Sequence, residues 1–204
     1  MTAWAADPTD VMRARLYEQG IVIVNGELDD DLAARVAAEL MLLDATRDAA
    51  VKLWLNSGGG TLEAAFALID VIDLLGVPVH ATCIGRAEGP ALGVLTVASH
   101  RVAIPHARLR LCEPATAFAG RADDVARWSA ERDAATARFC ARLADATKRP
   151  AEWIAEAIRE GRFLDAHEAM RAGFIDEIAH SNAATVSSID RRPIGFRSRQ
   201  QRPL

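Results

Sequence analysis

Short apolar runs alternate with longer segments of helical periodicity between residues 21 and 98. Each run is rich in β-branched or large apolar residues and is bounded by turn-forming residues, as expected for a buried strand. These strands are predicted at 21–24, 51–55 and 79–84. A helix is predicted after each of them, at about 29–45, 61–75 and 91–98. This alternation is typical of an α/β domain with a largely parallel sheet.

The second half of the chain continues with shorter strands and one unusually long helical segment. Two strands are expected near Arg101–Ile104 and Arg108–Leu111, and helices at Asp123–Ala146, after Pro150 and at His167–Ala172. The apolar residues on roughly one side of the long helix are Val125, Trp128, Ala135, Phe139 and Leu143. Ala91–Ala98 is instead apolar all round, so this helix must be buried on every side.

Two strand-to-helix turns are expected, at Asn56–Thr61 and Gly85–Pro90. Such turns are where α/β folds place their chemistry. The first contains Gly58-Gly59-Gly60, whose N–H groups could bind a phosphate or a peptide backbone. The same glycines could equally serve only the tight turn, so both interpretations stay open.

Composition excludes several broad classes of protein. Half of the 204 residues are hydrophobic and a quarter are charged, which is typical of one soluble globular domain. The net charge of −4 argues against nucleic-acid binding. No apolar run reaches the roughly 18 residues of a membrane helix, so no membrane association is expected. The first ten residues lack the basic and apolar regions of a secretory signal.

The cysteines and histidines point to neither a disulfide framework nor a metal site. Cys83, Cys112 and Cys140 lie far apart, and a sparse, odd number of cysteines favours a reducing compartment. We therefore predict a cytoplasmic protein. The five histidines show no spacing typical of metal ligands, so neither a metal nor another cofactor is expected.

The basic residues are concentrated at the C-terminal end. The last 14 residues include five arginines and no acidic residue, and the sequence from about Ser181 is rich in Ser, Asn, Pro, Arg and Gln. We interpret residues 181–204 as a flexible basic tail. Residues 16–180 are predicted to form one domain, preceded by an N-terminal segment at 1–15.

Five segments of the chain together resemble the proteolytic subunit of the Clp protease, the ClpP family. They occur in the family's order and at near-family spacing: Leu16–Gly26, Leu53–Gly60, Cys83–Gly89, Ile104–Pro114 and Arg162–Asp176. The resemblance implies a ClpP/crotonase-like α/β fold, a superhelix of β-β-α units in which the long helix at 123–146 is the handle. It also implies heptameric or tetradecameric rings capped by a Clp ATPase.

The three catalytic positions that the resemblance implies carry unsuitable residues. The family's nucleophilic serine, in a motif like G-x-A-A-S-M-G, falls on Gly89. The histidine, in a motif like M-I-H-Q-P, falls on Cys112, and the aspartate that precedes an R-F pair falls on Gly161. Glycine has no side chain that can attack or orient, and a cysteine does not accept a hydroxyl proton as imidazole does.

The implied oxyanion hole is also incomplete. One donor, from the glycine turn, remains as Gly59 or Gly60, but the residue after the serine position is Pro90, which has no N–H. We therefore interpret the chain as a pseudoprotease. It would be a non-catalytic ClpP-like subunit with a structural or regulatory part in ATP-dependent proteolysis. The expected partners are further copies of the chain, a catalytically active ClpP paralogue, or both, together with a Clp ATPase.

Other chemistry at the same residues stays open as alternatives. The chain could be an active Clp-type serine endopeptidase whose chemistry the motifs do not reveal. Separately, Ser57 could be a replacement nucleophile, or Cys112 a displaced one activated by His80 or His106. Alternatively, Glu88 could serve a crotonase-like enzyme acting on a CoA thioester. The simpler interpretation of Glu88 is a charge that points into the cleft or pairs with Arg86.

Two further features suggest contacts with partners. The resemblance favours an inter-ring contact for the helix at 123–146, although its apolar stripe could simply pack on its own core. In the tail, Ile194-Gly195-Phe196 resembles the loop with which Clp ATPases dock on the proteolytic ring. A tripeptide also arises by chance, so both explanations of this match are kept.

Overall fold

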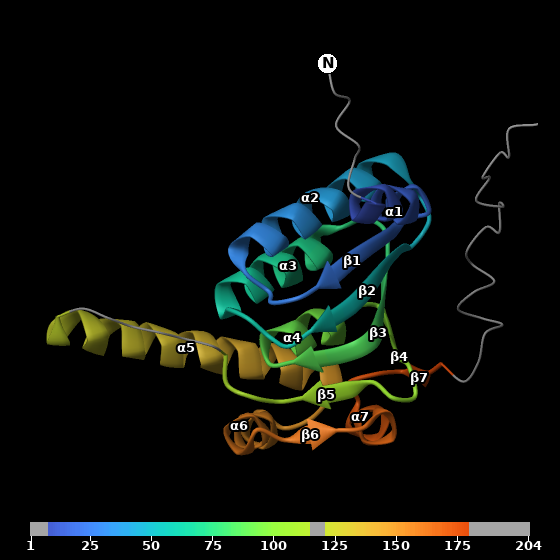
Figure 1. The fold of residues 1–204 in the computed structure, drawn as a ribbon. Coiled ribbons are helices and arrows are strands. Elements are labelled where there is room, and N and C mark those ends of the chain that lie inside the picture. The colour runs from blue at the N-terminus through green and yellow to red at the C-terminus, as the bar shows by residue number, and fades with distance from the viewer. Residues whose placement is uncertain (1–7, 115–120, 180–204) are drawn as a thin grey trace, which may run out of the picture.

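The computed structural model describes residues 8–114 and 121–179, and a mixed sheet is the centre of this part of the chain (Figure 1). The strands are β1 (Ile21–Asn25), β2 (Val51–Ser57), β3 (Val79–Glu88), β4 (His100–Ala103), β5 (Arg108–Arg110), β6 (Phe163–Leu164) and β7 (Glu177–Ile178). Their order is β1-β2-β3-β4-β7, and β5 pairs with both β3 and β6. Every pairing is parallel except that of β5 with β6. The predicted α/β class is confirmed.

Seven helices surround this sheet in the described residues. They are α1 (Pro8–Glu18), α2 (Asp30–Thr46), α3 (Leu62–Leu74), α4 (Pro90–Thr96), α5 (Ala122–Thr147), α6 (Ala151–Glu160) and α7 (Ala166–Ala172). Two of the predicted helix starts are capped as their sequences indicate. The Asp29 side chain accepts a hydrogen bond from the Leu32 N–H at 2.8 Å, and Thr61 accepts one from the Ala64 N–H at 3.2 Å.

Strand β3 is longer than the sequence predicts, because residues 85–88 are strand and not part of a turn. Its last residues pair in parallel with β5, with Arg86 opposite Arg108 and Glu88 opposite Arg110. This partner strand lies about 22 residues further along the chain, so local periodicity does not reveal the pairing. The turn into α4 is therefore confined to Gly89.

An additional helix, α1, forms at the N-terminal end, where no element was predicted. Its isolated pattern is polar and weakly amphipathic, so the sequence alone gives little sign of it. The Arg13 guanidinium donates two hydrogen bonds of 2.9 Å to the Glu39 carboxylate on α2. This bidentate contact holds α1 against α2.

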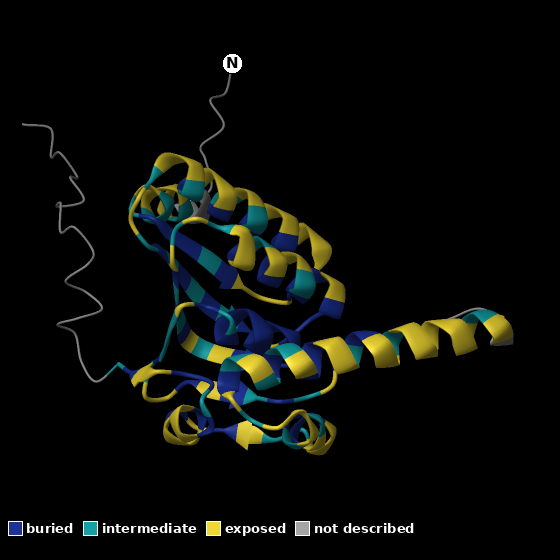
Figure 2. Ribbon diagram, turned by 180° about the vertical axis from the view of Figure 1, so that it is seen from behind, coloured by how far each residue is buried: buried dark blue, intermediate teal, exposed yellow. Residues whose placement is uncertain are grey.

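Helices α4 and α5 differ sharply in burial. Every residue of α4 is buried, as the sequence predicts. Helix α5 leaves the body of the molecule, and its projecting part is largely exposed (Figures 1 and 2). Along its predicted apolar stripe, Ala135, Phe139 and Leu143 are buried, whereas Val125 and Trp128 are 37% and 44% exposed. The stripe therefore packs on the chain's own core only over the second half of α5.

An ion pair closes the C-terminal end of the sheet and gives a pH prediction. The Arg101 guanidinium donates to the Asp176 carboxylate and to the Gly173 carbonyl. Its hydrogen bond to the carboxylate is the main cause that holds the pKa of Asp176 below its ordinary value. Because the folded-state pKa is lowered, the contribution to stability is present above about pH 4 and is lost as pH falls further. We expect Asp176→Asn to lower the free energy of unfolding by about 1 kcal/mol at pH 7.

Denaturation of both proteins between pH 2.5 and pH 7 measures this effect. The difference between wild type and Asp176→Asn should shrink as the pH falls below 4. Asp133→Asn, an exposed position on α5, is the matched control and should change stability by less than about 0.5 kcal/mol. A difference for Asp176→Asn that stays constant over the whole pH range contradicts the prediction.

Candidate functional site

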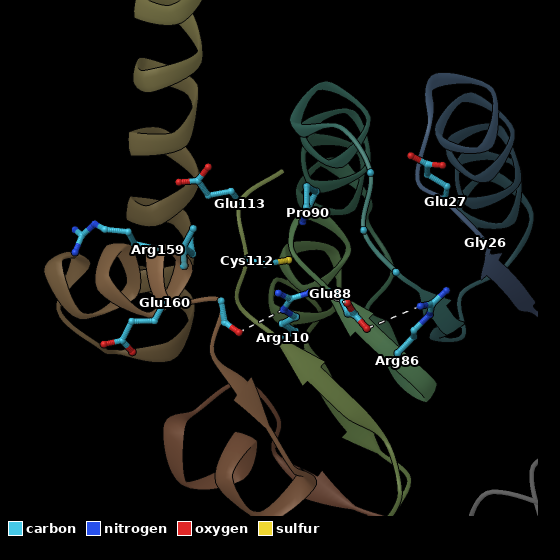
Figure 3. Close-up of a pocket in the computed structure, with 15 residues that line it drawn as sticks. Gly26, Glu27, Arg86, Glu88, Pro90, Arg110, Cys112, Glu113, Arg159 and Glu160 are labelled. Atoms are coloured by element: carbon cyan, nitrogen blue, oxygen red, sulfur yellow. Dashed lines mark hydrogen bonds and ion pairs between the residues drawn. The ribbon is translucent and has the colours of Figure 1, made fainter. Parts of the chain in front are cut away.

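An open cleft of about 710 Å³ lies where β3 ends and α4 begins (Figure 3). The glycine loop after β2 forms one side, and the end of α6 forms another. Its lining residues are Gly26, Glu27, Gly58, Gly59, Gly60, Arg86, Glu88, Pro90, Arg110, Cys112, Glu113, Ile158, Arg159, Glu160 and Gly161. Both segments that the sequence predicts for chemistry therefore reach the same cleft.

The backbone at Gly89 has a conformation that favours glycine. Its φ is +48° and ψ is −123°, and its N–H donates a 2.9 Å hydrogen bond to the Arg110 carbonyl. A Cβ atom built on Gly89 would lie 3.2 Å from Cys112 Sγ. Positions 89 and 112 therefore face each other across the turn, with the geometry of neighbours in direct contact.

Gly161 joins this group from the end of α6. It caps that helix with a φ of +66°, and a Cβ atom on it would lie 3.1 Å from the Arg110 guanidinium. The Arg110 Nε donates a 3.3 Å hydrogen bond to the Gly161 carbonyl. The structure thus places Cys112 and Gly161 on the wall of one cleft, with Gly89 against Cys112.

The glycine loop is fixed by its own hydrogen bonds. Ser57 is fully buried. Its hydroxyl donates a hydrogen bond to the Gly59 carbonyl at 3.1 Å and accepts one from the Gly59 N–H at 3.3 Å. Gly60 forms a parallel bridge with Leu28, whose N–H donates to the Gly59 carbonyl. Pro90 lines the cleft as the first residue of α4. Ser57 therefore supports the loop and is closed off from the cleft.

Four charged side chains form a square on one face of β3 and β5, which we call the charged square: Arg86, Glu88, Arg108 and Arg110. Residues two apart in a strand share a face, and the register sets Arg86 beside Arg108 and Glu88 beside Arg110. The Glu88 side chain is 9% exposed and accepts a 3.1 Å hydrogen bond from Arg108. Arg86 and Arg110 approach it to 4.0 Å and 3.8 Å.

Sequence reasoning anticipated only the Arg86–Glu88 part of this square. The two-residue spacings R-x-E at 86–88 and R-x-R at 108–110 were a signal for the remainder. Because both segments are strands, charged side chains two residues apart in either segment lie on the same face of that strand. The pairing of β3 with β5 is non-local, so the sequence could not show that the charges of both strands lie on one face of the sheet.

Known proteins similar to this chain share one family. The sequence model of the Clp protease family matches residues 6–182. The chain is also 32% identical over 177 residues to the "ATP-dependent Clp protease proteolytic subunit 2" of Chlamydia muridarum, covering 84% of this chain and 86% of that protein. The chain belongs to the Clp protease family. The resemblance predicted from five short segments is confirmed.

This Clp protease family member has an unactivated thiol in its cleft. Burial raises the pKa of Cys112 and the nearby Glu88 carboxylate adds to that rise, while the Arg110 guanidinium opposes it. No histidine is among the described residues that line the cleft. His80 contacts His100 at the start of β3, roughly 25 Å of strand away from Glu88, and His106 lies in the exposed turn before β5. The structure brings neither histidine to Cys112.

The raised pKa of Cys112 predicts slow alkylation. At pH 7 we expect iodoacetamide to modify Cys112 several-fold more slowly than a cysteine in a short peptide, with the rate rising above pH 9. Peptide mass spectrometry after timed quenching measures this, and Cys112→Ser identifies the signal. Modification faster than the peptide at pH 7 contradicts the prediction, because it requires a stabilised thiolate.

Candidate metal-ligand groups and helices that could span a membrane are both absent from the described part of this Clp protease family member. No group of three or more metal-ligating side chains occurs within residues 8–114 and 121–179. Over the same residues, no helix is both long and apolar enough to span a membrane. The predicted docking tripeptide, Ile194, Gly195 and Phe196, lies outside the described residues.

Proposed function

We propose that this chain is a non-catalytic subunit of the Clp protease family, which assembles into Clp-type rings and has a structural or regulatory part in proteolysis. The observation that carries the proposal is the cleft. Cys112 and Gly161 line it and Gly89 lies against Cys112, yet these three residues supply no hydroxyl, imidazole or carboxylate. The scaffold of an active site is present without its reactive groups.

The remaining groups at the cleft do not replace the missing chemistry. Acyl transfer needs a nucleophile, a base and donors to the developing oxyanion. Cys112 has a raised pKa, no histidine of the described residues lines the cleft beside it, and Pro90 has no N–H to donate. The Gly59 N–H already donates to the Ser57 hydroxyl. The described residues of the cleft therefore offer no activated nucleophile, no histidine base and no donor at position 90.

The two alternative activities have less support from the geometry. An active serine endopeptidase would need another nucleophile, and Ser57 is buried and hydrogen-bonded within its own loop. A crotonase-like enzyme would need a carboxylate free to act on its substrate, and Glu88 is 9% exposed and bound to Arg108. Both residues are used by the fold itself.

Assembly into rings is the second part of the proposal. Helix α5 projects from the domain with Val125 and Trp128 exposed, which favours a contact with another subunit (Figure 2). Native mass spectrometry of the chain, alone and mixed with the active Clp subunit from the same cell, tests this part. A ring containing either copies of the chain or both subunits supports the proposal, and a persistent monomer in both samples contradicts it.

The absence of catalysis is tested with an active-site probe and a substrate. We expect no labelling by a fluorophosphonate and no hydrolysis of a fluorogenic peptide above the rate of a buffer blank. The active Clp subunit is the positive control for both reagents. Labelling of any serine in the pure chain, with matching hydrolysis, would refute the proposal and favour an active peptidase.

A further inference from the structure

The charged square contains more positive charge than its buried carboxylate needs. Arg108 donates the hydrogen bond to Glu88 at 3.1 Å and does not line the cleft. Arg86 and Arg110 both line the cleft, with side chains 52% and 36% exposed. One close arginine neutralises Glu88, so the other two leave a local excess of positive charge facing the cleft.

Two of the three other carboxylates that line the cleft are paired with arginines outside the charged square. Glu113 accepts a 3.1 Å contact from Arg132, and Glu160 accepts a 2.6 Å contact from Arg162. Arg159 is likewise paired, with Glu156. Glu27 lies beside Gly26, across the cleft from Arg110 (Figure 3). The excess charge is therefore concentrated at Arg86 and Arg110.

Each of the two guanidinium groups has contacts that favour its position at the cleft before any ligand arrives. Arg110 packs 4.6 Å from the centre of the Phe163 ring and donates to the Gly161 carbonyl. Arg86 lies over Gly58, where even a Cβ atom would come within 2.9 Å of its guanidinium carbon. The absence of a side chain at Gly58 thus leaves room for the Arg86 guanidinium beside the glycine loop. Planar guanidinium groups fixed in this way are suited to a carboxylate.

We propose that this cleft binds a carboxylate of an extended peptide, held by Arg86 and Arg110, and releases the peptide uncleaved. The proposal rests on the non-catalytic function proposed above. An open cleft with a glycine loop on one wall accommodates an extended backbone, and the two arginines select its charge. The carboxylate could belong to an acidic side chain or to the C-terminus, and the test distinguishes these sources.

Isothermal titration calorimetry of the full-length chain with four short peptides tests the selection. Two peptides with blocked ends differ only in a central Glu or Gln, a third carries Lys there, and a fourth combines central Gln with a free C-terminal carboxylate. We expect the Glu peptide, the free-carboxylate peptide, or both, to bind at least tenfold more tightly than the blocked Gln peptide. The Lys peptide should bind most weakly.

Three substitutions connect the preference to the charged square. Arg86→Gln should remove most of the tenfold preference, because Glu88 keeps Arg108 and the fold is retained. Arg138→Gln, an exposed arginine on α5 with one carboxylate partner, is the matched control and should leave the preference unchanged. Glu88→Gln should tighten binding of the carboxylate peptide several-fold, because it removes the negative charge between the two arginines.

The outcomes separate this proposal from the proposed function. Equal binding of all four peptides, no binding to any, or a preference that survives Arg86→Gln and is unmoved by Glu88→Gln would each overturn the carboxylate site. Mass spectrometry of the recovered peptides provides the second readout. Intact peptides agree with a non-catalytic subunit, whereas cleaved peptides would overturn the proposed function itself.

Discussion

The Gly60→Ala substitution is expected to destabilise the domain by about 3–5 kcal/mol, one of the two largest effects that we predict. A Cβ atom on Gly60 would meet the Leu28 carbonyl carbon at 2.6 Å and overlap its oxygen. The neighbour is backbone, held in a parallel bridge, so it has little room to yield. The φ of +154° adds strain for any residue with a side chain. Urea denaturation of purified protein, or loss of soluble expression, measures the effect.

Alanine substitutions at two other glycines distinguish the steric clash with Leu28 from the backbone strain of a positive φ. Gly26 has a φ of +101° with open space around it, so Gly26→Ala should cost about 1 kcal/mol from backbone strain alone. Gly76 has an ordinary φ and one contact at 3.5 Å, so Gly76→Ala should change stability by less than about 0.5 kcal/mol. If Gly60→Ala were no more costly than Gly26→Ala, the close approach of Leu28 would be excluded as the reason for glycine.

Restoring the three catalytic side chains alone is expected to leave peptidase activity about 10²-fold below that of a variant that also has the missing oxyanion donor. In a triple variant, Gly89→Ser, Cys112→His and Gly161→Asp, the new aspartate would lie within reach of the Arg110 guanidinium and pair with it. Pro90 would still provide no oxyanion donor. Adding Pro90→Ala supplies that donor, and we expect it to raise the rate by about 10²-fold over the triple variant.

Hydrolysis of a fluorogenic peptide and the rate of fluorophosphonate labelling measure this effect. Pro90→Ala in the wild-type background is the control and should stay inactive, because it adds a donor without a nucleophile. Circular dichroism and thermal melting must show that each variant is folded, since Gly89 and Gly161 both have positive φ. A triple variant that is already as active as the quadruple variant contradicts the role assigned to Pro90.

Local patterns in the sequence predict most of the fold. β-Branched runs give β1, β2 and the first part of β3, and the caps at Asp29 and Thr61 give the starts of α2 and α3. The last residues of β3 escape this approach because their partner, β5, lies far along the chain. Helix α1 escapes it because a tertiary contact, Arg13 with Glu39, supports a weakly amphipathic segment.

The candidate site is predicted in part for similar reasons. Motif resemblance points to Gly89, Cys112 and Gly161; Cys112 and Gly161 line one cleft, and Gly89 lies against Cys112. Glu88 is noticeable in the sequence as a charge at an apolar helix entrance. Its partners Arg108 and Arg110 depend on strand register, which local sequence does not specify. The sequence therefore indicates which single residues are unusual, but it does not indicate which residues of different strands lie beside each other.

The uneven support of α5 has a consequence for hydrogen exchange. At the described positions, no residue of α5 before Ala135 is buried, so the first half of this 26-residue helix has less packing to support it than the second half. Short helices without tertiary contacts open readily in water. Backbone amides in an isolated subunit should therefore exchange with deuterium progressively more slowly from Asp123 toward Thr147. Docking of a second subunit on the projecting half would flatten that gradient, making α5 an internal reporter of assembly.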